Sequence, residues 1–159
     1  MSETAEKFQA VLNLPFGRVG ISMHQGRLVG VDYLDDPIPP YRSQAKGLEP
    51  VLKGIEHYMK DAQSDFDVDI ELTGTPFQQQ VWRELQAIPA GQTLTYGQLA
   101  ERIGSGARAV GNACRANPCP LVIPCHRVVA ASGLGGFAGQ RSGRKLEVKR
   151  WLLQHEGWL

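Results

Sequence analysis

Hydrophobic and polar residues alternate in two short stretches near the start of the chain. Val19, Ile21 and Met23 are the apolar positions of the first stretch, and those of the second are Val29, Val31 and Tyr33. An alternation with a period of two is typical of a half-buried strand. Gln25-Gly26 lies between the stretches, so the pattern predicts a β-hairpin.

Three further elements are predicted in the first half of the chain. Residues 35–40 contain three prolines and read as a loop. The apolar residues between Leu48 and Met59 fall on one helical stripe. Residues 68–72 alternate apolar and acidic side chains, which predicts a strand with an acidic outer face. The first half is therefore a small α+β unit.

Two capping boxes predict helix starts in the second half. Thr75 stands three residues before Gln78, and Thr95 three residues before Gln98. The second of these predicted helices ends at a glycine-containing break, and a third is expected at 107–116. Two short helices joined by such a turn have the layout of a helix-turn-helix, although many helical hairpins bind nothing.

The rest of the second half predicts a strand, a loop and a helix. Leu121-Val122-Ile123 is expected to be a buried strand, and residues 131–143 form a glycine-rich loop. The apolar face of the last helix is expected to consist of Val148, Trp151, Leu152 and His155. Gly157 ends this helix.

The charge distribution divides the chain in two. Residues 1–74 carry seven basic and twelve acidic side chains, whereas residues 75–159 carry ten basic and four acidic ones. We expect two domains with this boundary, an N-terminal α/β support domain and a C-terminal functional domain. The positive charge of the second suits a polyanion, and it equally suits a contact with the acidic half.

The composition is that of a soluble globular chain, with 42% hydrophobic and 21% charged residues. No apolar run approaches the roughly 20 residues that a membrane helix needs, and from residues 1–7 we expect no secretory signal. The three cysteines, at positions 114, 119 and 125, do not suggest a disulfide framework. We therefore expect a cytoplasmic protein with no membrane partner.

The most informative stretch for chemistry is Pro124-Cys125-His126-Arg127-Val128. A cysteine beside a histidine and an arginine is in a setting that favours the thiolate, because positive charge lowers a thiol pKa. Side chains of neighbouring residues in a strand point to opposite faces. Either the chain turns sharply after Pro124, or a water relays the proton to His126. Glu156 is the obvious acid to orient that histidine.

Two other interpretations of these cysteines stay open on the residues alone. Cys125 is equally explained as an inert buried thiol. Cys114 and Cys119 have a zinc-like spacing, but Cys125 and His126 are adjacent and supply no matched second pair. We expect no metal site.

The Pro124–Val128 segment resembles the active-site signature of the O6-alkylguanine-DNA alkyltransferases, the methylated-DNA–protein-cysteine methyltransferases. Further similar segments follow in the order and spacing of that family: 77–82 (FQQQVW), 95–100 (TYGQLA), 107–111 (ARAVG), Asn117-Pro118 and 151–157 (WLLQHEG). The resemblance is strong over 75–157 and weak over 1–74. It implies an α+β protein with a small N-terminal α/β domain that is RNase H-like. The C-terminal domain would be a winged-helix-like helix-turn-helix domain.

The function that this resemblance implies is DNA repair by a protein that acts once. An alkyl group would pass from O6-alkylguanine, and from O4-alkylthymine, in double-stranded DNA to Cys125, without any cofactor. His126 would deprotonate the thiol through a water, with Glu156 behind it. Asn117 would shape the turn, and Tyr96 would donate a proton to the departing guanine. We expect a monomer in solution, and cooperative assembly along DNA stays open.

The resemblance also assigns DNA and substrate contacts. Arg108 would enter the base stack in place of the flipped nucleotide. The remaining DNA contacts would come from Thr95, Ala109, Gly111, Arg115 and Ser132. The pocket for the alkylated base would be lined by Val128, Pro120, Gly136, Phe137 and Ala138. Ala138 stands where many relatives carry a hydroxyl residue, which leaves one substrate hydrogen bond without a donor.

Two rival functions share parts of this pattern. Alkyltransferase-like proteins have the same fold but replace the nucleophile and only flag lesions, and Cys125 argues against that class. A thiol hydrolase would need a competent water for a second step and would turn over. The mass of the protein after reaction separates these functions.

Overall fold

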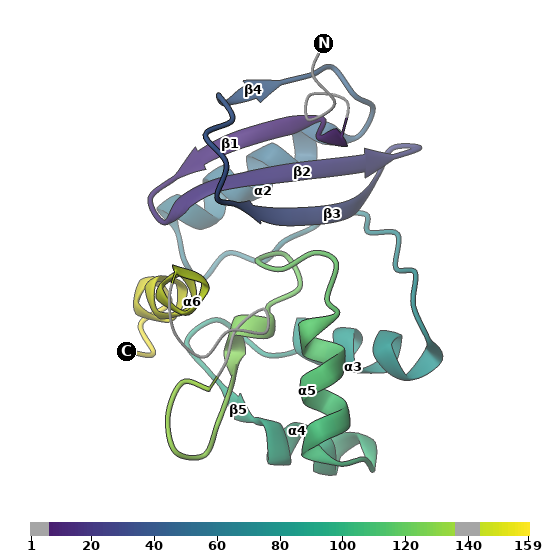
Figure 1. The fold of residues 1–159 in the computed structure, drawn as a ribbon, viewed down its shortest axis with the longest axis vertical. Helices are drawn as coiled ribbons and strands as arrows, with labels where there is room; N and C mark the ends of the chain where they lie inside the picture. The colour runs from purple at the N-terminus through teal and green to yellow at the C-terminus, as the bar shows by residue number, and fades with distance from the viewer. Residues whose placement is uncertain (1–6, 136–143) are drawn as a thin grey trace. The chain divides into compact units, whose positions relative to one another are not determined.

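The first of two compact units, Met1–Leu72, is built on an antiparallel sheet with the strand order β3-β2-β1-β4 (Figure 1). Its strands are β1 (Ala10–Leu14), β2 (Gly17–His24), β3 (Arg27–Leu34) and β4 (Tyr41–Arg42). The structure, a computed structural model, describes residues 7–135 and 144–159. The second unit, Thr73–Leu159, is described by itself below.

The predicted hairpin is confirmed, but of the three apolar residues predicted to be buried in its second strand only Val31 is buried. β2 and β3 join at Gln25 and Gly26, whose φ angles of 51° and 81° suit a type I′ turn. The register shifts at this end of the pair, because Ser22 faces Gly30 and Met23 faces Leu28. Val29 is thus an extra, bulged residue. Val31 is buried as predicted, whereas Leu28 and Leu34 are buried in place of Val29 and Tyr33, which are half-buried.

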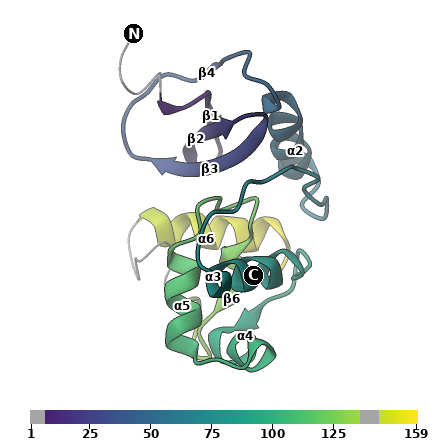
Figure 2. The ribbon, with the colours of Figure 1, turned by 90° about the vertical axis from the view of Figure 1, so that its right-hand side faces the viewer.

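One helix, α2 (Leu48–Lys60), covers a face of this sheet (Figure 2). The predicted stripe is confirmed, and its buried residues are Leu48, Val51, Leu52, Ile55 and Tyr58. The helix begins after Gly47, which has a φ of 80°. A Cβ at Gly47 would collide with the backbone carbonyl of Gly26, so the start of the helix is fixed against the hairpin turn.

The acidic strand predicted at 68–72 does not form. Exposure does alternate along this segment, with Asp67 and Asp69 exposed and Val68 and Ile70 half-buried. Ile70 makes only an isolated parallel bridge to Leu28. Both backbone hydrogen bonds of that bridge involve Leu28, whose N–H donates to the carbonyl of Asp69 and whose carbonyl accepts from the N–H of Glu71. The ladder does not extend beyond this one residue.

The second unit begins with three helices, of which the first two start at the predicted capping boxes. Its helices are α3 (Pro76–Gln86), α4 (Tyr96–Ile103), α5 (Ala107–Arg115) and α6 (Arg144–His155), and its strands β5 (Leu94–Thr95) and β6 (Val128–Val129) pair in parallel. In both boxes the threonine hydroxyl accepts a hydrogen bond from the backbone N–H of the glutamine three residues later. The side-chain oxygen of that glutamine accepts one from the backbone N–H of the threonine. Trp82 Nε1 donates to the carbonyl of Ala113 at 2.9 Å and so holds α3 against α5.

Two predictions for the C-terminal part were wrong. Leu121–Ile123 is buried but forms a turn, in which Leu121 has a φ of 77°, instead of a strand. On α6 Val148 and Leu152 are buried as predicted, but Lys149 and Leu153 are buried as well. Trp151 and His155, which were predicted on the buried face, are half-buried and stack on each other. Leu152, Leu153 and Glu156 follow Lys149 at helical spacing, so the buried face is rotated from the predicted one.

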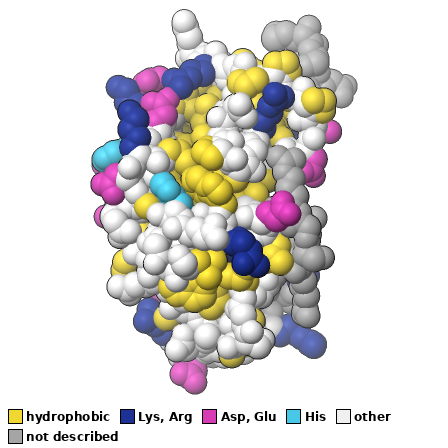
Figure 3. Space-filling view, turned by 90° about the vertical axis from the view of Figure 1, so that its left-hand side faces the viewer, with side chains coloured by type: hydrophobic (Ala, Val, Ile, Leu, Met, Phe, Trp, Pro, Cys, Tyr) yellow, Lys and Arg dark blue, Asp and Glu magenta, His cyan; other side chains and the backbone are white. Residues whose placement is uncertain are grey.

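Large hydrophobic side chains are mostly buried in the part of the chain that the structure describes. Of the large hydrophobic side chains in residues 7–135 and 144–159, Leu159 is the one classed as exposed. Figure 3 shows hydrophobic areas interrupted by charged side chains of both signs. Among the helices in this part of the chain, none has the length and apolar character that crossing a bilayer requires.

Candidate active site

Cys125 begins a sharp turn, so Cys125 and His126 do not lie in a regular strand. Cys125–Arg127 is a single 3₁₀ turn, closed by a bond from Arg127 N to the carbonyl of Pro124 at 3.0 Å. The sharp turn after Pro124 that the sequence left open does form. The side chain of Cys125 lies in the interior, and the residue is 7% exposed.

His126 is fully buried and bound to a carboxylate. Its Nε2 lies 2.7 Å from Oε2 of Glu156, which is also buried. A carboxylate only accepts hydrogen bonds, so Nε2 carries the proton in the neutral ring. Nδ1 is buried and has no hydrogen-bond partner among the described residues. The histidine therefore presents one unprotonated nitrogen inside the site.

Arg127 does not face the thiol, contrary to the prediction that it favours the thiolate. Its Nε and Nη2 donate to the two carboxylate oxygens of Glu156 at 2.9 and 3.0 Å, and Nη1 donates to the carbonyl of Ile88 at 2.6 Å. Such a forked pair neutralises the guanidinium locally. Burial raises the pKa of Cys125 above its ordinary value, so the resting group is a neutral thiol.

The pKa values of the two residues bound together here are displaced by opposing causes. Burial lowers the pKa of His126, and the attraction of Glu156 only partly opposes it, so the ring stays neutral near pH 7. Burial alone would raise the pKa of Glu156, but its bonds to His126 and Arg127 lower it to about 2. The site therefore holds an ionised carboxylate behind a neutral base.

Lys149 is a buried cation that the sequence analysis missed. Its ammonium donates to the carbonyl of Val128 at 2.7 Å and lies 6.0 Å from the ring centre of Tyr96. Burial lowers the pKa of Lys149 to about 8, whereas Cys125 and Cys114 raise it. In turn Lys149 lowers the pKa of Cys125, so it stabilises the thiolate. The sequence signal was a lysine at helical spacing with buried Leu152, Leu153 and Glu156.

Asn117 holds the turn that leads to Cys125. Its Nδ2 donates to the carbonyl of Ile123 at 2.8 Å, and its Oδ1 accepts from the backbone of Cys119 at 3.0 Å. A hydrogen bond from the Asn117 side chain also lowers the pKa of Cys125. One amide thus fixes the backbone on both sides of the apolar turn and stabilises negative charge on sulfur.

Tyr96 lies beside this site at the start of α4. β5 pairs with β6, and Thr95 is opposite Val129, so the sheet brings Tyr96 close to the 3₁₀ turn. A Cβ at Gly135 would come within 3.2 Å of the Tyr96 ring and 3.1 Å of the Ala130 backbone. Gly135 also has a φ of 73°, so glycine is needed for this close approach.

The residues assigned to DNA contact lie in exposed or half-exposed places. Those that are exposed are Arg108, Ala109, Arg115 and Ser132, while Gly111 and Thr95 are half-buried. Thr95 also caps α4, so its hydroxyl already has a structural partner. Among the assigned pocket residues, Val128 is buried and Pro120 half-buried. Gly136, Phe137 and Ala138 lie outside the described residues.

The three cysteines are free thiols, and all are buried. Within residues 7–135 and 144–159, no three His, Cys, Asp or Glu side chains form a group that could hold a metal ion. Cys114 interacts electrostatically with Cys125, and burial raises its pKa to about 12. Cys114 is therefore a neutral thiol next to the candidate nucleophile.

Fold and site together define a mixed α/β protein with a buried cysteine, a neutral histidine and an ionised glutamate. The family model "6-O-methylguanine DNA methyltransferase, DNA binding domain" matches residues 76–158. The chain belongs to this family.

Known relatives agree with this membership. A probable methylated-DNA–protein-cysteine methyltransferase of Acanthamoeba polyphaga mimivirus is 39% identical over 135 residues, which is 83% of each chain. A methylated-DNA–protein-cysteine methyltransferase of Salmonella typhimurium is 53% identical over 89 residues, or 54% of this chain and 49% of that protein. The crystal structure of Mycobacterium tuberculosis OGT in complex with DNA superposes with a TM-score of 0.78 at 34% identity, covering 92% of this chain and 91% of that one. The chain has the mixed α/β fold of that structure.

Proposed function

We propose that this protein repairs DNA by moving an alkyl group from O6 of guanine to the sulfur of Cys125. The sulfur attacks the alkyl carbon, a C–S bond forms, and the C–O bond breaks with its electron pair passing to the purine. The observation that carries this proposal is the buried His126, whose Nδ1 is unpartnered among the described residues and which follows Cys125 in one turn. The names of the relatives support the same reaction.

The thiol must lose its proton during the reaction, because burial keeps it neutral at rest. Nδ1 of His126 takes that proton through a bridging water, while Glu156 holds Nε2–H and stabilises the imidazolium. Asn117 and Lys149 stabilise the thiolate that forms. Deprotonation is thus coupled to attack, and the resting thiol stays protected.

Substrate access supports base flipping. Cys125 is 7% exposed, so its sulfur cannot reach a guanine inside a duplex. The target nucleotide must leave the stack and enter the site. Arg108, exposed in the first turn of α5, would fill the vacated space, with Ala109, Gly111, Arg115, Thr95 and Ser132 along the DNA. Tyr96 would donate a proton to the purine as negative charge develops there.

The reaction ends after one transfer. A thioether has no good leaving group, so each molecule acts once and needs no cofactor. O4-alkylthymine presents a similar alkyl–oxygen bond and is a second substrate in this proposal. Val128, Pro120 and the segment 136–138 would line the pocket for the base.

The fold details of the proposal follow the same family. Residues 1–74 would form an RNase H-like support domain, which the antiparallel sheet and α2 support. Residues 75–159 would form a winged-helix-like domain, which the α4–α5 pair supports. The protein would act as a monomer on double-stranded DNA.

The test is the intact mass of the protein after incubation with a duplex oligonucleotide that contains O6-methylguanine. We expect a gain of one methyl group per molecule that stops at one equivalent. Cys125→Ser should gain nothing, whereas the matched control Cys114→Ser should still be methylated. DNA binding without a mass gain would instead indicate a lesion-recognition protein, and turnover without a mass gain would indicate a hydrolase.

A further inference from the structure

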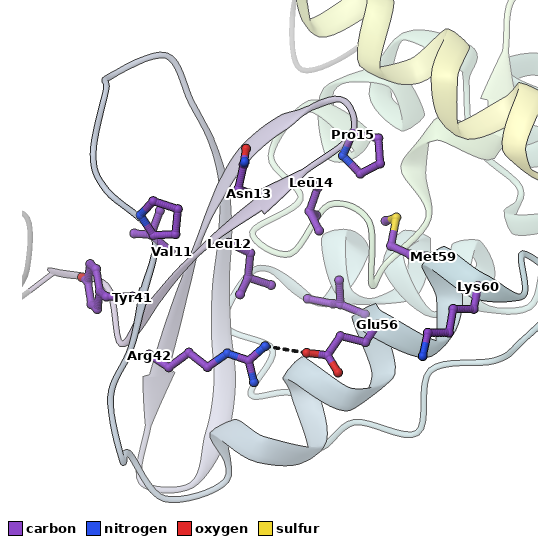
Figure 4. A pocket seen from close by; sticks show the side chains of 12 residues that line it. Val11, Leu12, Asn13, Leu14, Pro15, Tyr41, Arg42, Glu56, Met59 and Lys60 are labelled. Carbon is purple, nitrogen blue, oxygen red and sulfur yellow. Dashed lines mark hydrogen bonds and ion pairs between the residues drawn. The ribbon is translucent and has the colours of Figure 1, made fainter.

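A cavity of about 630 Å³ lies in the first unit, and none of the residues that line it belongs to the candidate active site. Its walls come from β1, from residues 40–42 and from the C-terminal half of α2 (Figure 4). Pockets that bind small molecules usually enclose about 300–1,000 Å³. The cavity therefore has the size of a ligand site.

The cavity exists because β4 is too short to cover β1. β4 pairs with β1 only at Ala10 and Val11, whereas β1 continues to Leu14. Among the described residues, no strand pairs with 12–14 on that side. The open edge of β1 and the facing side of α2 leave a space between them.

The floor of this space is apolar. Leu12 and Ile55 are buried, at 9% and 0% exposure, and Leu14 and Met59 are half-buried. Figure 4 shows Leu12, Leu14 and Met59 around the hollow between the strand and the helix. Methionine is flexible and polarisable, so Met59 can adjust to ligands of different shape.

The rim carries one more positive than negative charge. Arg42 of β4 and Glu56 of α2 form an ion pair of 2.5 Å across the opening. Lys60, one helical turn after Glu56, also lines the cavity and is exposed. Within the described part of the chain, Lys60 has no ion-pair partner. An apolar floor under an unpaired ammonium fits a molecule with an apolar body and one anionic group.

We propose that this cavity binds a small apolar monoanion of the medium-chain carboxylate class. The hydrocarbon part lies on Leu12, Leu14, Ile55 and Met59, and the carboxylate accepts hydrogen bonds from Lys60. The Arg42–Glu56 pair stays intact and closes one side of the opening. The site is independent of alkyl transfer, because none of its residues takes part in that reaction.

The proposal is tested with sodium decanoate as the anionic probe and decanol as its neutral analogue, both below micelle-forming concentrations. Calorimetry measures affinity, and backbone amide NMR of isotope-labelled full-length protein locates the binding. We expect saturable binding of one decanoate per molecule, with shifts concentrated at 11–15, 40–42 and 55–60. Decanol should bind about tenfold more weakly, since it lacks the charge-assisted bond to Lys60.

Two variants separate the charge from the cavity. Lys60→Gln should weaken decanoate binding about tenfold and leave decanol unchanged, whereas the control Lys53→Gln, on the same helix but not in the cavity wall, should change neither. Leu14→Trp should fill the space and weaken both probes. Methyl transfer should be normal in all three variants. The proposal is overturned by non-saturable binding, by shifts elsewhere in the chain, or by equal effects of Lys60→Gln and Lys53→Gln.

Discussion

Replacing Glu156 with glutamine tests the central contact of the site. Glu156 is 3% exposed and holds both His126 and Arg127. Its pKa of about 2 lies well below the ordinary value of 4.5. At 1.36 kcal/mol per pH unit, that difference corresponds to about 3 kcal/mol of folding stability. Removing one partner of a buried ion pair costs about 3–5 kcal/mol, which agrees in size.

The sign of the pH dependence follows from the lowered pKa. The contribution of Glu156 is fully present above the pKa of the unfolded chain, near 4.5, and is lost as the pH falls toward 2. Glu156→Gln should therefore be less stable than the wild type by about 3 kcal/mol at pH 7. The two proteins should converge as the pH falls through that window.

Urea unfolding followed by tryptophan fluorescence measures this difference in stability for the second unit, Thr73–Leu159, which contains Glu156. All three tryptophans, Trp82, Trp151 and Trp158, lie within the second unit. Glu147→Gln is the matched control, because Glu147 is exposed on α6 and its loss should cost little. A stability loss below about 1 kcal/mol, or a loss that is the same at pH 7 and pH 3, would refute the reasoning.

Three further perturbations address the thiolate, the cap and the DNA face. Lys149→Met should slow single-turnover methyl transfer about tenfold or more, whereas the control Lys145→Met should not. In the wild type the rate should fall above pH 8, where Lys149 becomes neutral. The rate of Lys149→Met should not show this fall. Thr95→Ala removes the N-cap of α4 and should cost about 1 kcal/mol in urea unfolding, with an unchanged midpoint counting against the capping role. Arg108→Ala should weaken binding to duplex DNA, measured by fluorescence anisotropy. If the guanidinium contacts a phosphate, the slope of log affinity against log salt concentration should also decrease in size by about one.

Elements that depend on neighbouring residues were predictable from the sequence. The capping boxes at Thr75 and Thr95 formed with both of their bonds, because all partners lie within three residues. The stripe of α2 was predictable for the same reason, since helical spacing alone decides which side chains share a face. Cys125, His126 and Glu156 were singled out by residue type and resemblance, and the structure brings His126 and Glu156 into contact.

Elements that depend on distant partners were not predictable. The apolar run 121–123 is as consistent with a buried turn as with a strand, because periodicity does not distinguish them. The resemblance did assign Asn117 to shaping this turn, but its particular bonds to Ile123 and Cys119 are known only from the structure. Arg127 was expected to act on the thiol, but its guanidinium instead donates to Glu156, which lies far along the chain. The bulge at Val29 likewise depends on the register of two strands and not on the strand's own alternation.

The buried charges of the site suggest why a neutral resting thiol is compatible with reactivity. Arg127 and Glu156 neutralise each other, and His126 is neutral, whereas Lys149 is a buried ammonium that interacts electrostatically with Cys125. Burial of that ammonium is unfavourable, as its pKa of about 8 indicates. Loss of the Cys125 proton places a negative charge where Lys149 and Asn117 already stabilise it. The positive group is in place before the anion forms, so the reacting state needs little reorganisation and gains more from the site than the resting state does.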